Sequence, residues 1–133
     1  MYITLETDYA VRIVAYLSGL GEGRADSRSI SGKTGVPPRF TVKILRKLSA
    51  GGVVNSCKGP RGGYFLARPA GEITLLEVVE LIEGACVLSR CEQEGYECRQ
   101  GSCRFYNVYA EISRGLRESM GRYTFDQLSG VGK

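Results

Sequence analysis

The sequence predicts a mainly α-helical protein with one small β-hairpin, and three observations support this fold class. Apolar residues recur at helical spacing in several segments of the 133-residue chain. A short helical segment, a tight turn near Gly35 and a second, basic helical segment follow one another over residues 26–50. Two β-prone segments, at about 53–57 and 63–67, flank a glycine-rich turn. Together they predict a winged helix-turn-helix domain over residues 1–70, followed by a long C-terminal helix.

The chain opens with a helix in TDYAVRIVAYLSGLG, and five of its apolar residues recur at helical spacing: Ala10, Ile13, Val14, Leu17 and Leu20. We expect Thr7 or Asp8 to cap its start, because either side chain can accept a hydrogen bond from a backbone N–H. The next helix is short and lies in DSRSISGKTG. We expect Asp26 or Ser27 to cap it and Gly35 to end it.

The following segment, VPPRFTVKILRKLSAGG, contains the candidate recognition helix at residues 38–50. Pro38 suits the first turn of a helix, where its missing N–H costs nothing, and Gly51 and Gly52 stop the helix. The inward stripe consists of Thr41, Ile44, Leu45 and Leu48. The basic outer face consists of Arg39, Lys43, Arg46 and Lys47. An ordinary amphipathic helix with a solvated basic face is the alternative interpretation.

The segment VVNSCKGPRGGYFLARP predicts the hairpin that would form the wing. Its tip carries Lys58 and Arg61, which can reach a phosphate or the minor groove of DNA. Glycines at positions 59, 62 and 63 let the backbone approach closely. A plain hairpin that only closes the core is the alternative.

Charge is distributed unevenly along the chain. Residues 1–70 carry eleven Lys and Arg against four Asp and Glu, a net charge of +7, whereas residues 71–133 carry seven against ten, a net charge of −3. A basic first half indicates a polyanionic partner, and we expect double-stranded DNA. The residues that we expect to contact DNA are Arg28, Arg39, Thr41, Lys43, Lys47, Lys58 and Arg61.

The second half, residues 71–133, is expected to hold a linker helix, a cysteine loop at 86–103 and a dimerisation helix. In ITLLEVVELIEG, Thr74 and Glu77 form a capping box, and Gly84 ends the helix. The long segment RFYNVYAEISRGLRESM has one apolar stripe, which consists of Phe105, Val108, Tyr109, Ile112, Leu116 and Met120. We expect this stripe to form the interface of a homodimer. A last short helix begins near Thr124.

Three of the five cysteines, Cys91, Cys98 and Cys103, lie in the polar loop CEQEGYECRQGSC. Thiolates at such short intervals are typical of zinc and iron–sulfur sites, which usually need a fourth ligand. Cys86 or a carboxylate can supply it, and Cys86 would complete an all-cysteine site. However, Cys86 in GACVL and Cys57 on the predicted wing strand are more typical of buried structural cysteines.

Several classes are disfavoured by what the sequence lacks. It contains no histidine, which excludes Ser–His and Cys–His catalysis, and it has no phosphate-loop motif, so we do not expect an enzyme. Glu6, Asp8 and Arg12 interrupt the first twenty residues, so we expect neither a signal peptide nor a membrane span. We expect a cytoplasmic protein, in which clustered cysteines indicate metal or redox chemistry.

Five features together resemble one family: TDYAVR, the basic helix, KGPRGGYFLAR, the helix TLLEVVELIEG, and a three-cysteine loop before a long helix. The chain resembles the IscR/NsrR-type winged-helix regulators, a bacterial family that senses iron–sulfur clusters, nitric oxide, iron or redox state. The resemblance covers about residues 1–128. The wing sequence and the cysteine loop are its most specific parts.

In that family the loop cysteines ligate an iron–sulfur cluster, which implies this role for Cys91, Cys98 and Cys103. In the IscR branch a histidine three residues after the third cysteine completes the site, whereas this chain has Tyr106 there. In the NsrR branch an aspartate in the first helix of the other subunit is the fourth ligand of a four-iron cluster. The matching residue is Asp8, so we expect a 4Fe-4S cluster, with 2Fe-2S as the alternative. The cysteine gaps are six and four residues instead of the family's two gaps of five.

The resemblance also implies a homodimer that places two recognition helices about one DNA turn apart, roughly 34 Å, on a partial palindrome. The cluster would tie the cysteine loop of one subunit to Asp8 of the other, so its loss would let the reading heads shift. We expect a repressor, because operator occlusion needs no polymerase contact, controlled by nitric oxide, redox state or iron. A zinc-stabilised DNA-binding module and a disulfide switch without a cluster are the alternatives.

Overall fold

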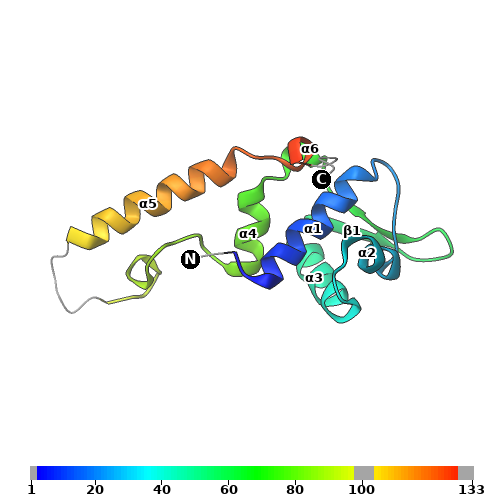
Figure 1. The fold of residues 1–133 in the computed structure, drawn as a ribbon, viewed down its shortest axis with the longest axis horizontal. Coiled ribbons are helices and arrows are strands. Elements are labelled where there is room, and N and C mark those ends of the chain that lie inside the picture. Colours follow the sequence, from blue (N-terminus) through cyan, green and yellow to red (C-terminus); the bar gives the residue numbers. More distant parts are fainter. Residues whose placement is uncertain (1–2, 98–103, 129–133) are drawn as a thin grey trace.

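The computed structural model describes residues 3–97 and 104–128. Its helices are α1 (Leu5–Gly19), α2 (Ser27–Thr34), α3 (Pro38–Ala50), α4 (Leu75–Glu83), α5 (Arg104–Gly121) and α6 (Phe125–Leu128). Two strands, β1 (Val54–Cys57) and β2 (Gly63–Leu66), form an antiparallel hairpin. Helices α1 to α3 and the hairpin form a compact body, α4 lies beside it, and α5 extends away as an arm (Figure 1). The predicted mainly helical fold with a winged helix-turn-helix domain is confirmed.

Local capping explains where the helices of the body begin and end. Asp26 caps α2, because its Oδ1 accepts a 2.7 Å hydrogen bond from the Ser29 N–H, and this bond holds the pKa of Asp26 below its ordinary value. Gly35 ends α2 in the left-handed conformation, with φ of 78°. The cap predicted for α1 is wrong: Thr4, not Thr7 or Asp8, accepts the Thr7 N–H, and α1 begins one turn earlier.

The hairpin pairs Val54 with Leu66 and Cys57 with Gly63. Two of its glycines, Gly62 and Gly63, are required by close backbone approach. A Cβ on Gly62 would lie 2.2 Å from the carbonyl oxygen of Cys57, and a Cβ on Gly63 would lie 2.9 Å from the backbone of Ala25. Ala25 in turn pairs with Tyr64 through two backbone hydrogen bonds. The glycine-rich turn is therefore fixed both within the hairpin and against the segment before α2.

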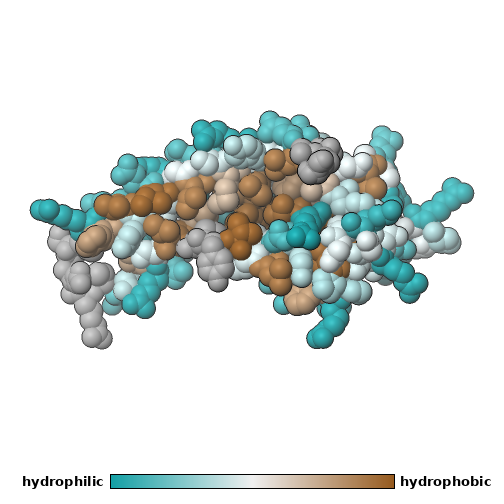
Figure 2. All heavy atoms as spheres, in the orientation of Figure 1, coloured by the Kyte–Doolittle hydropathy of each residue, from teal (hydrophilic) through white to brown (hydrophobic). Residues whose placement is uncertain are grey.

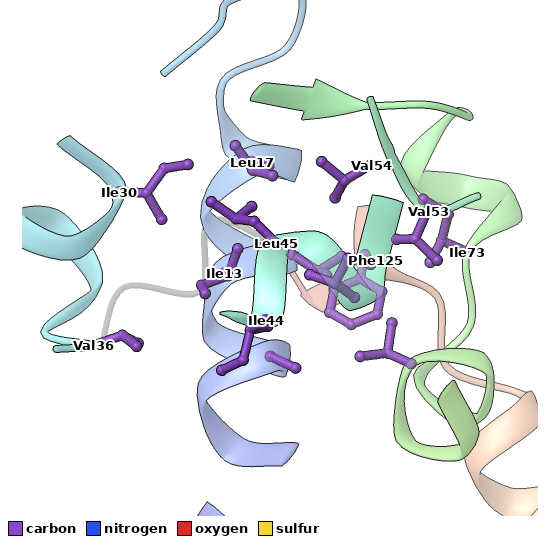
Figure 3. Close-up of a cluster of buried hydrophobic side chains, with 14 of the residues drawn as sticks. Ile13, Leu17, Ile30, Val36, Ile44, Leu45, Val53, Val54, Ile73 and Phe125 are labelled. Carbon is purple, nitrogen blue, oxygen red and sulfur yellow. The ribbon is translucent and has the colours of Figure 1, made fainter. Parts of the chain in front are cut away.

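A single hydrophobic core lies between α1, α3 and the hairpin, as Figure 3 shows. Ile13, Ile44 and Leu45 are fully buried there. Ile73 and Phe125, which come after the expected boundary at residue 70, are fully buried in the same core. The Phe125 N–H donates to the Ile73 carbonyl oxygen over 3.1 Å. The C-terminal segment thus returns to complete the body.

Helix α4 begins after Thr74, whose hydroxyl accepts the Glu77 N–H over 3.1 Å. The expected reciprocal half of this capping box does not form, because the Glu77 carboxylate accepts a hydrogen bond from Arg68 instead. That carboxylate raises the pKa of Arg68. Helix α5 packs on α4 at one side. None of the described helices is both long enough and apolar enough to cross a membrane.

Candidate nucleic-acid interface and cysteine loop

The outer face of α3 consists of four exposed residues: Arg39, Val42, Lys43 and Arg46. The opposite face contributes Ile44, Leu45 and Leu48 to the core. Thr41 belongs to that inner face and is fully buried, and its hydroxyl donates to the carbonyl oxygens of Val36 and Pro37. A buried side chain cannot reach a DNA groove, so the predicted DNA contact of Thr41 is corrected: Thr41 joins α3 to the turn before it.

Two lysines of α3 meet a carboxylate from the first helix. The Lys47 Nζ lies 2.5 Å from the Glu6 Oε1, and the Lys43 Nζ lies 4.0 Å from the same oxygen. On this side of α3, Phe40 also packs against Tyr9 of α1, with ring centroids 5.7 Å apart. The start of α1 is therefore attached to the candidate recognition helix through both charged and aromatic contacts. Glu6 was not predicted, and no sequence motif marks it.

The other predicted DNA contacts are exposed. Arg28 lies in the first turn of α2, and Lys58 and Arg61 lie in the turn between β1 and β2. At the base of the wing, the Arg24 guanidinium lies 5.0 Å from the ring centroid of Phe65. The body thus presents cations from α2, α3 and the hairpin, which is the charge that a DNA backbone requires.

The first part of the cysteine loop is docked on α5. Ser89 and Glu92 form a capping box around the short 3-10 helix Arg90–Glu92. The Glu92 Oε2 accepts hydrogen bonds from the Leu88 N–H over 3.1 Å and from the Ser113 hydroxyl over 2.9 Å. The pattern S-x-x-E at positions 89–92 could have predicted this cap. Cys91 is half-buried in this turn, with its Sγ 3.1 Å from the Ser89 Oγ.

The cysteines have contrasting environments. Cys98 and Cys103, two of the three predicted loop ligands, lie outside the described residues. Cys86 is fully buried, its N–H donates to Glu80 over 2.8 Å, and burial raises the pKa of its thiol. This burial favours the structural interpretation of Cys86 over a ligand role. Cys57 is exposed, so the expectation that it would be buried on the wing strand is wrong.

Asp8, the predicted fourth ligand, lies on the side of α1 and is partly exposed. Its Oδ2 pairs with the Nε of Arg12 over 3.0 Å, one helical turn away. Among the described residues, no three Cys, Asp or Glu side chains are gathered as a metal ion would require. The donor types fit an iron–sulfur cluster in their chemistry, because soft thiolates are completed by one accessible carboxylate. The described residues of one chain do not bring Cys91 and Asp8 into a common site.

A carboxylate connects the start of α1 to the end of α4. The hydroxyls of Thr4 and Thr7 both donate to the Glu83 Oε2. These two hydrogen bonds, with a smaller contribution from Lys47, hold the pKa of Glu83 below its ordinary value. Thr7 is fully buried. Because Glu83 directly precedes the segment that leads to Cys91, the cysteine loop begins where α1 is held.

These features define a winged-helix protein whose helix α3 presents exposed cations. The sequence profile of the Rrf2 family, described as an iron-dependent transcriptional regulator, matches residues 3–130. The chain belongs to the Rrf2 family of transcriptional regulators, and the family resemblance seen in its sequence is confirmed.

Individual proteins agree with this assignment. Protein aau3 of Rhizobium meliloti (strain 1021) is 34% identical over 130 residues, which cover 96% of this chain and 84% of that protein. The solved structure of CymR (YrzC), the global cysteine regulator of B. subtilis, has a TM-score of 0.83 at 19% identity and covers 100% of this chain and 99% of its own. T. potens IscR has a TM-score of 0.78 at 21% identity, with 96% and 85% covered. The two structures share the fold of this chain.

Proposed function

We propose that the chain forms a homodimeric DNA-binding repressor whose operator affinity is controlled by an iron–sulfur cluster. Cys91, Cys98 and Cys103 of one subunit would hold the cluster together with Asp8 of the partner subunit. The observation that carries the DNA-binding part is the outer face of α3, where three cations are exposed in the position of a recognition helix. The description of the Rrf2 family as iron-dependent supports the cluster.

Contact with DNA would use three surfaces of the body. Arg39, Lys43 and Arg46 project from α3 toward the major groove or its phosphates, and Lys47 lies beside them, paired with Glu6. Arg28 from α2 and the wing residues Lys58 and Arg61 would contact the flanking backbone. Since each phosphate contact releases counterions, affinity should fall steeply as salt rises. A partial palindrome would match the two-fold symmetry of a dimer.

The dimer is supported by the outer side of α5. Ser113 is the residue of this helix that the chain itself buries, whereas Phe105 is 64% exposed and Ile112 is 45% exposed. The apolar side chains form a continuous strip along the arm in Figure 2. An 18-residue helix with so little burial depends on a second surface for stability. A second copy of α5 offers the same strip and satisfies this need by symmetry.

The chemistry of the cluster site follows from its donors. When bound, an iron–sulfur cluster supplies a group that oxidants and nitric oxide can attack. The capping box of Ser89 and Glu92 fixes the turn that carries Cys91 on α5, which supports a ligand role for this thiolate. Asp8 would exchange its pairing with Arg12 for the cluster, and a carboxylate among thiolates makes a labile site that suits a sensor.

Helix α1 connects this site to the reading helix. Asp8 and Glu6 lie in its first two turns, and Glu6 contacts Lys47 of α3. A change in the ligation of Asp8 would therefore move a helix that is attached to α3 by an ion pair and by the Tyr9–Phe40 ring contact. This attachment gives the cluster a short physical connection to DNA affinity.

The test begins with protein purified without oxygen. We expect a visible absorption band, iron and acid-labile sulfide, and an operator affinity that changes when the cluster is removed. Asp8→Ala should make the cluster more labile. Arg12→Gln is the matched control, because it removes the same ion pair but keeps the carboxylate. Equal cluster lifetimes in Asp8→Ala and wild type would exclude Asp8 as a ligand.

The same preparation distinguishes the alternatives. Stoichiometric zinc without iron would replace the sensor with a structural metal site. A protein that stays free of metal after reconstitution, and whose DNA affinity responds to peroxide after chelation, would be a disulfide switch. Cys91 and a second loop cysteine would then be the pair that forms the bond.

A further inference from the structure

One apolar side chain lies on the otherwise basic outer face of α3. Val42 is 38% exposed, and its neighbours on that face are Arg39, Lys43 and Arg46. The core does not use Val42, because the inward positions of the helix are Thr41, Ile44, Leu45 and Leu48. An exposed valine among cations adds nothing to attraction for phosphate. The group that would complement Val42 is therefore apolar and is carried by a polyanionic ligand.

Val42 forms part of a hollow between α2 and α3. The hollow measures about 440 Å³ and is lined by Ser27, Arg28, Ser31, Gly32, Pro38 and Val42. Small residues of α2 line one part of it, and Pro38 and Val42 of α3 supply its apolar wall. The Ser31 hydroxyl donates to the Val36 carbonyl oxygen inside the domain, so it is already engaged. Arg28 adds a cation at the edge of the same hollow.

The cations around the hollow favour DNA as its partner. Its apolar wall favours an apolar group on a base edge in the DNA groove. In the major groove each base presents hydrogen-bonding groups, and only thymine among the unmodified bases adds a methyl group, at C5. Val42 can neither donate nor accept a hydrogen bond, so guanine, adenine and cytosine edges offer it nothing. A C5 methyl group is the complementary surface.

We propose that the hollow between α2 and α3 is a thymine-reading subsite, in which Val42 and Pro38 pack against the C5 methyl group. Arg28 and Arg39 contact the phosphates on either side. The inference rests on the proposed DNA-binding function and adds to it a base preference in each half-site. It makes Val42 a specificity-determining residue, whereas Lys43 contributes affinity without regard to sequence.

The experiment uses the full-length dimer and an operator selected from a random DNA pool. Each thymine of the half-sites is then replaced by deoxyuridine, which removes only the methyl group. For wild type we expect one position per half-site at which this replacement weakens binding about fourfold, the loss for one buried methyl-sized group. Val42→Ala should bind the thymine operator several-fold more weakly, and it should lose the discrimination at that position.

Lys43→Gln is the matched comparison on the adjacent residue. It should weaken binding to thymine and uridine operators equally and reduce the salt slope by about one. Val42→Ala should leave the salt slope unchanged. Alanine at an exposed helical position keeps the fold, and circular dichroism of each variant checks this.

Two outcomes overturn the subsite. One is that replacing a thymine by deoxyuridine weakens binding equally in wild type and Val42→Ala, at every thymine of the half-sites. The other is an operator in which the position whose discrimination depends on Val42 is a cytosine, and 5-methylation of that cytosine raises affinity. This result would make methylcytosine the ligand of the hollow. Failure to select any sequence, or affinity that is insensitive to salt, would instead contradict the proposed DNA-binding function.

Discussion

The body and the α5 arm differ in whether their large apolar side chains are buried within the chain. In the body, side chains from α1, α3, the hairpin and α6 enclose one another, and Phe125 is fully buried. On α5, large apolar side chains of the same kind point outward, and Phe105 is the most exposed of them. The body therefore encloses its core within one chain, whereas the apolar strip of α5 is left exposed and is available for the proposed dimer. In the proposed function, DNA binding and sensing are divided along the same line, since the cysteine loop directly precedes the arm.

The largest expected effect on stability comes from comparing the same change, Phe to Ala, in the body and in the arm. Phe125→Ala should lower the free energy of unfolding by about 3–5 kcal/mol, because it empties a fully buried site at the junction of α6 with the body. Phe105→Ala should change the unfolding of the isolated body little and should weaken dimerisation. Urea titrations at fixed protein concentration measure the first effect. Similar losses of stability in the two variants at a concentration where only monomer is present would contradict the division.

The second prediction disrupts the proposed contact between two α5 helices and leaves the body intact. Ile112→Glu places a charge in the middle of the exposed strip of α5, and it should abolish the dimer at micromolar concentration, because an unpaired charge is costly to bury. Sedimentation velocity measures the mass, and circular dichroism should show a folded body. Glu111→Gln, on the exposed neighbouring residue, is the control and should remain dimeric. An Ile112→Glu dimer would mean that another surface joins the subunits.

The body was more predictable from sequence than the arm and the site. Asp26, Gly35 and Pro38 are local signals, and α2 and α3 begin and end where those signals place them. The start of α1 was misplaced because Thr4 and Thr7 are both capable caps, and a tertiary partner, Glu83, engages both of their hydroxyls. The helical period placed Thr41 correctly on the inner face, and the DNA contact predicted for the same residue was wrong because it disregarded that placement.

The candidate site depends on contacts that no local pattern specifies. Glu6 and Lys47 are 41 positions apart in sequence, and Thr7 and Glu83 are 76 apart, so their pairing becomes visible only in the folded chain. Phe125 likewise reaches the core from beyond the arm. By contrast, the Ser89–Glu92 cap is a four-residue pattern and was available from sequence.

The third prediction tests the junction between the two regions. Glu83→Gln should lower the free energy of unfolding by about 1 kcal/mol, because it weakens two hydrogen bonds to a charged acceptor that is partly exposed to solvent. Folding lowers the pKa of Glu83, so the unfolded chain binds more protons. The stabilisation is therefore complete above the ordinary glutamate pKa and is lost as pH falls through the folded pKa.

Urea titrations from neutral to acid pH measure this dependence. The difference between wild type and Glu83→Gln should shrink over that acid range, whereas Glu111→Gln should show no such change. A difference that stays constant with pH would mean that the Glu83 carboxylate does not act through its charge.

The smallest expected effect on stability concerns Glu6, which lies near the start of α1 and pairs with two lysines of α3. Glu6→Gln should change stability by only a few tenths of a kcal/mol, since its pairs with Lys43 and Lys47 are partly exposed. Its effect on DNA should be larger, because removing this carboxylate leaves both lysines available to phosphate. We expect operator affinity to rise a few-fold at low salt and the salt slope to become steeper.

Glu118→Gln makes the same charge change at an exposed position of α5 and should leave the salt slope of DNA binding as it is. If both variants raised affinity equally, net charge alone would explain the gain. If neither did, the lysines would bind Glu6 and DNA together, and α1 would be a fixed support of the reading helix that transmits no signal through this pair.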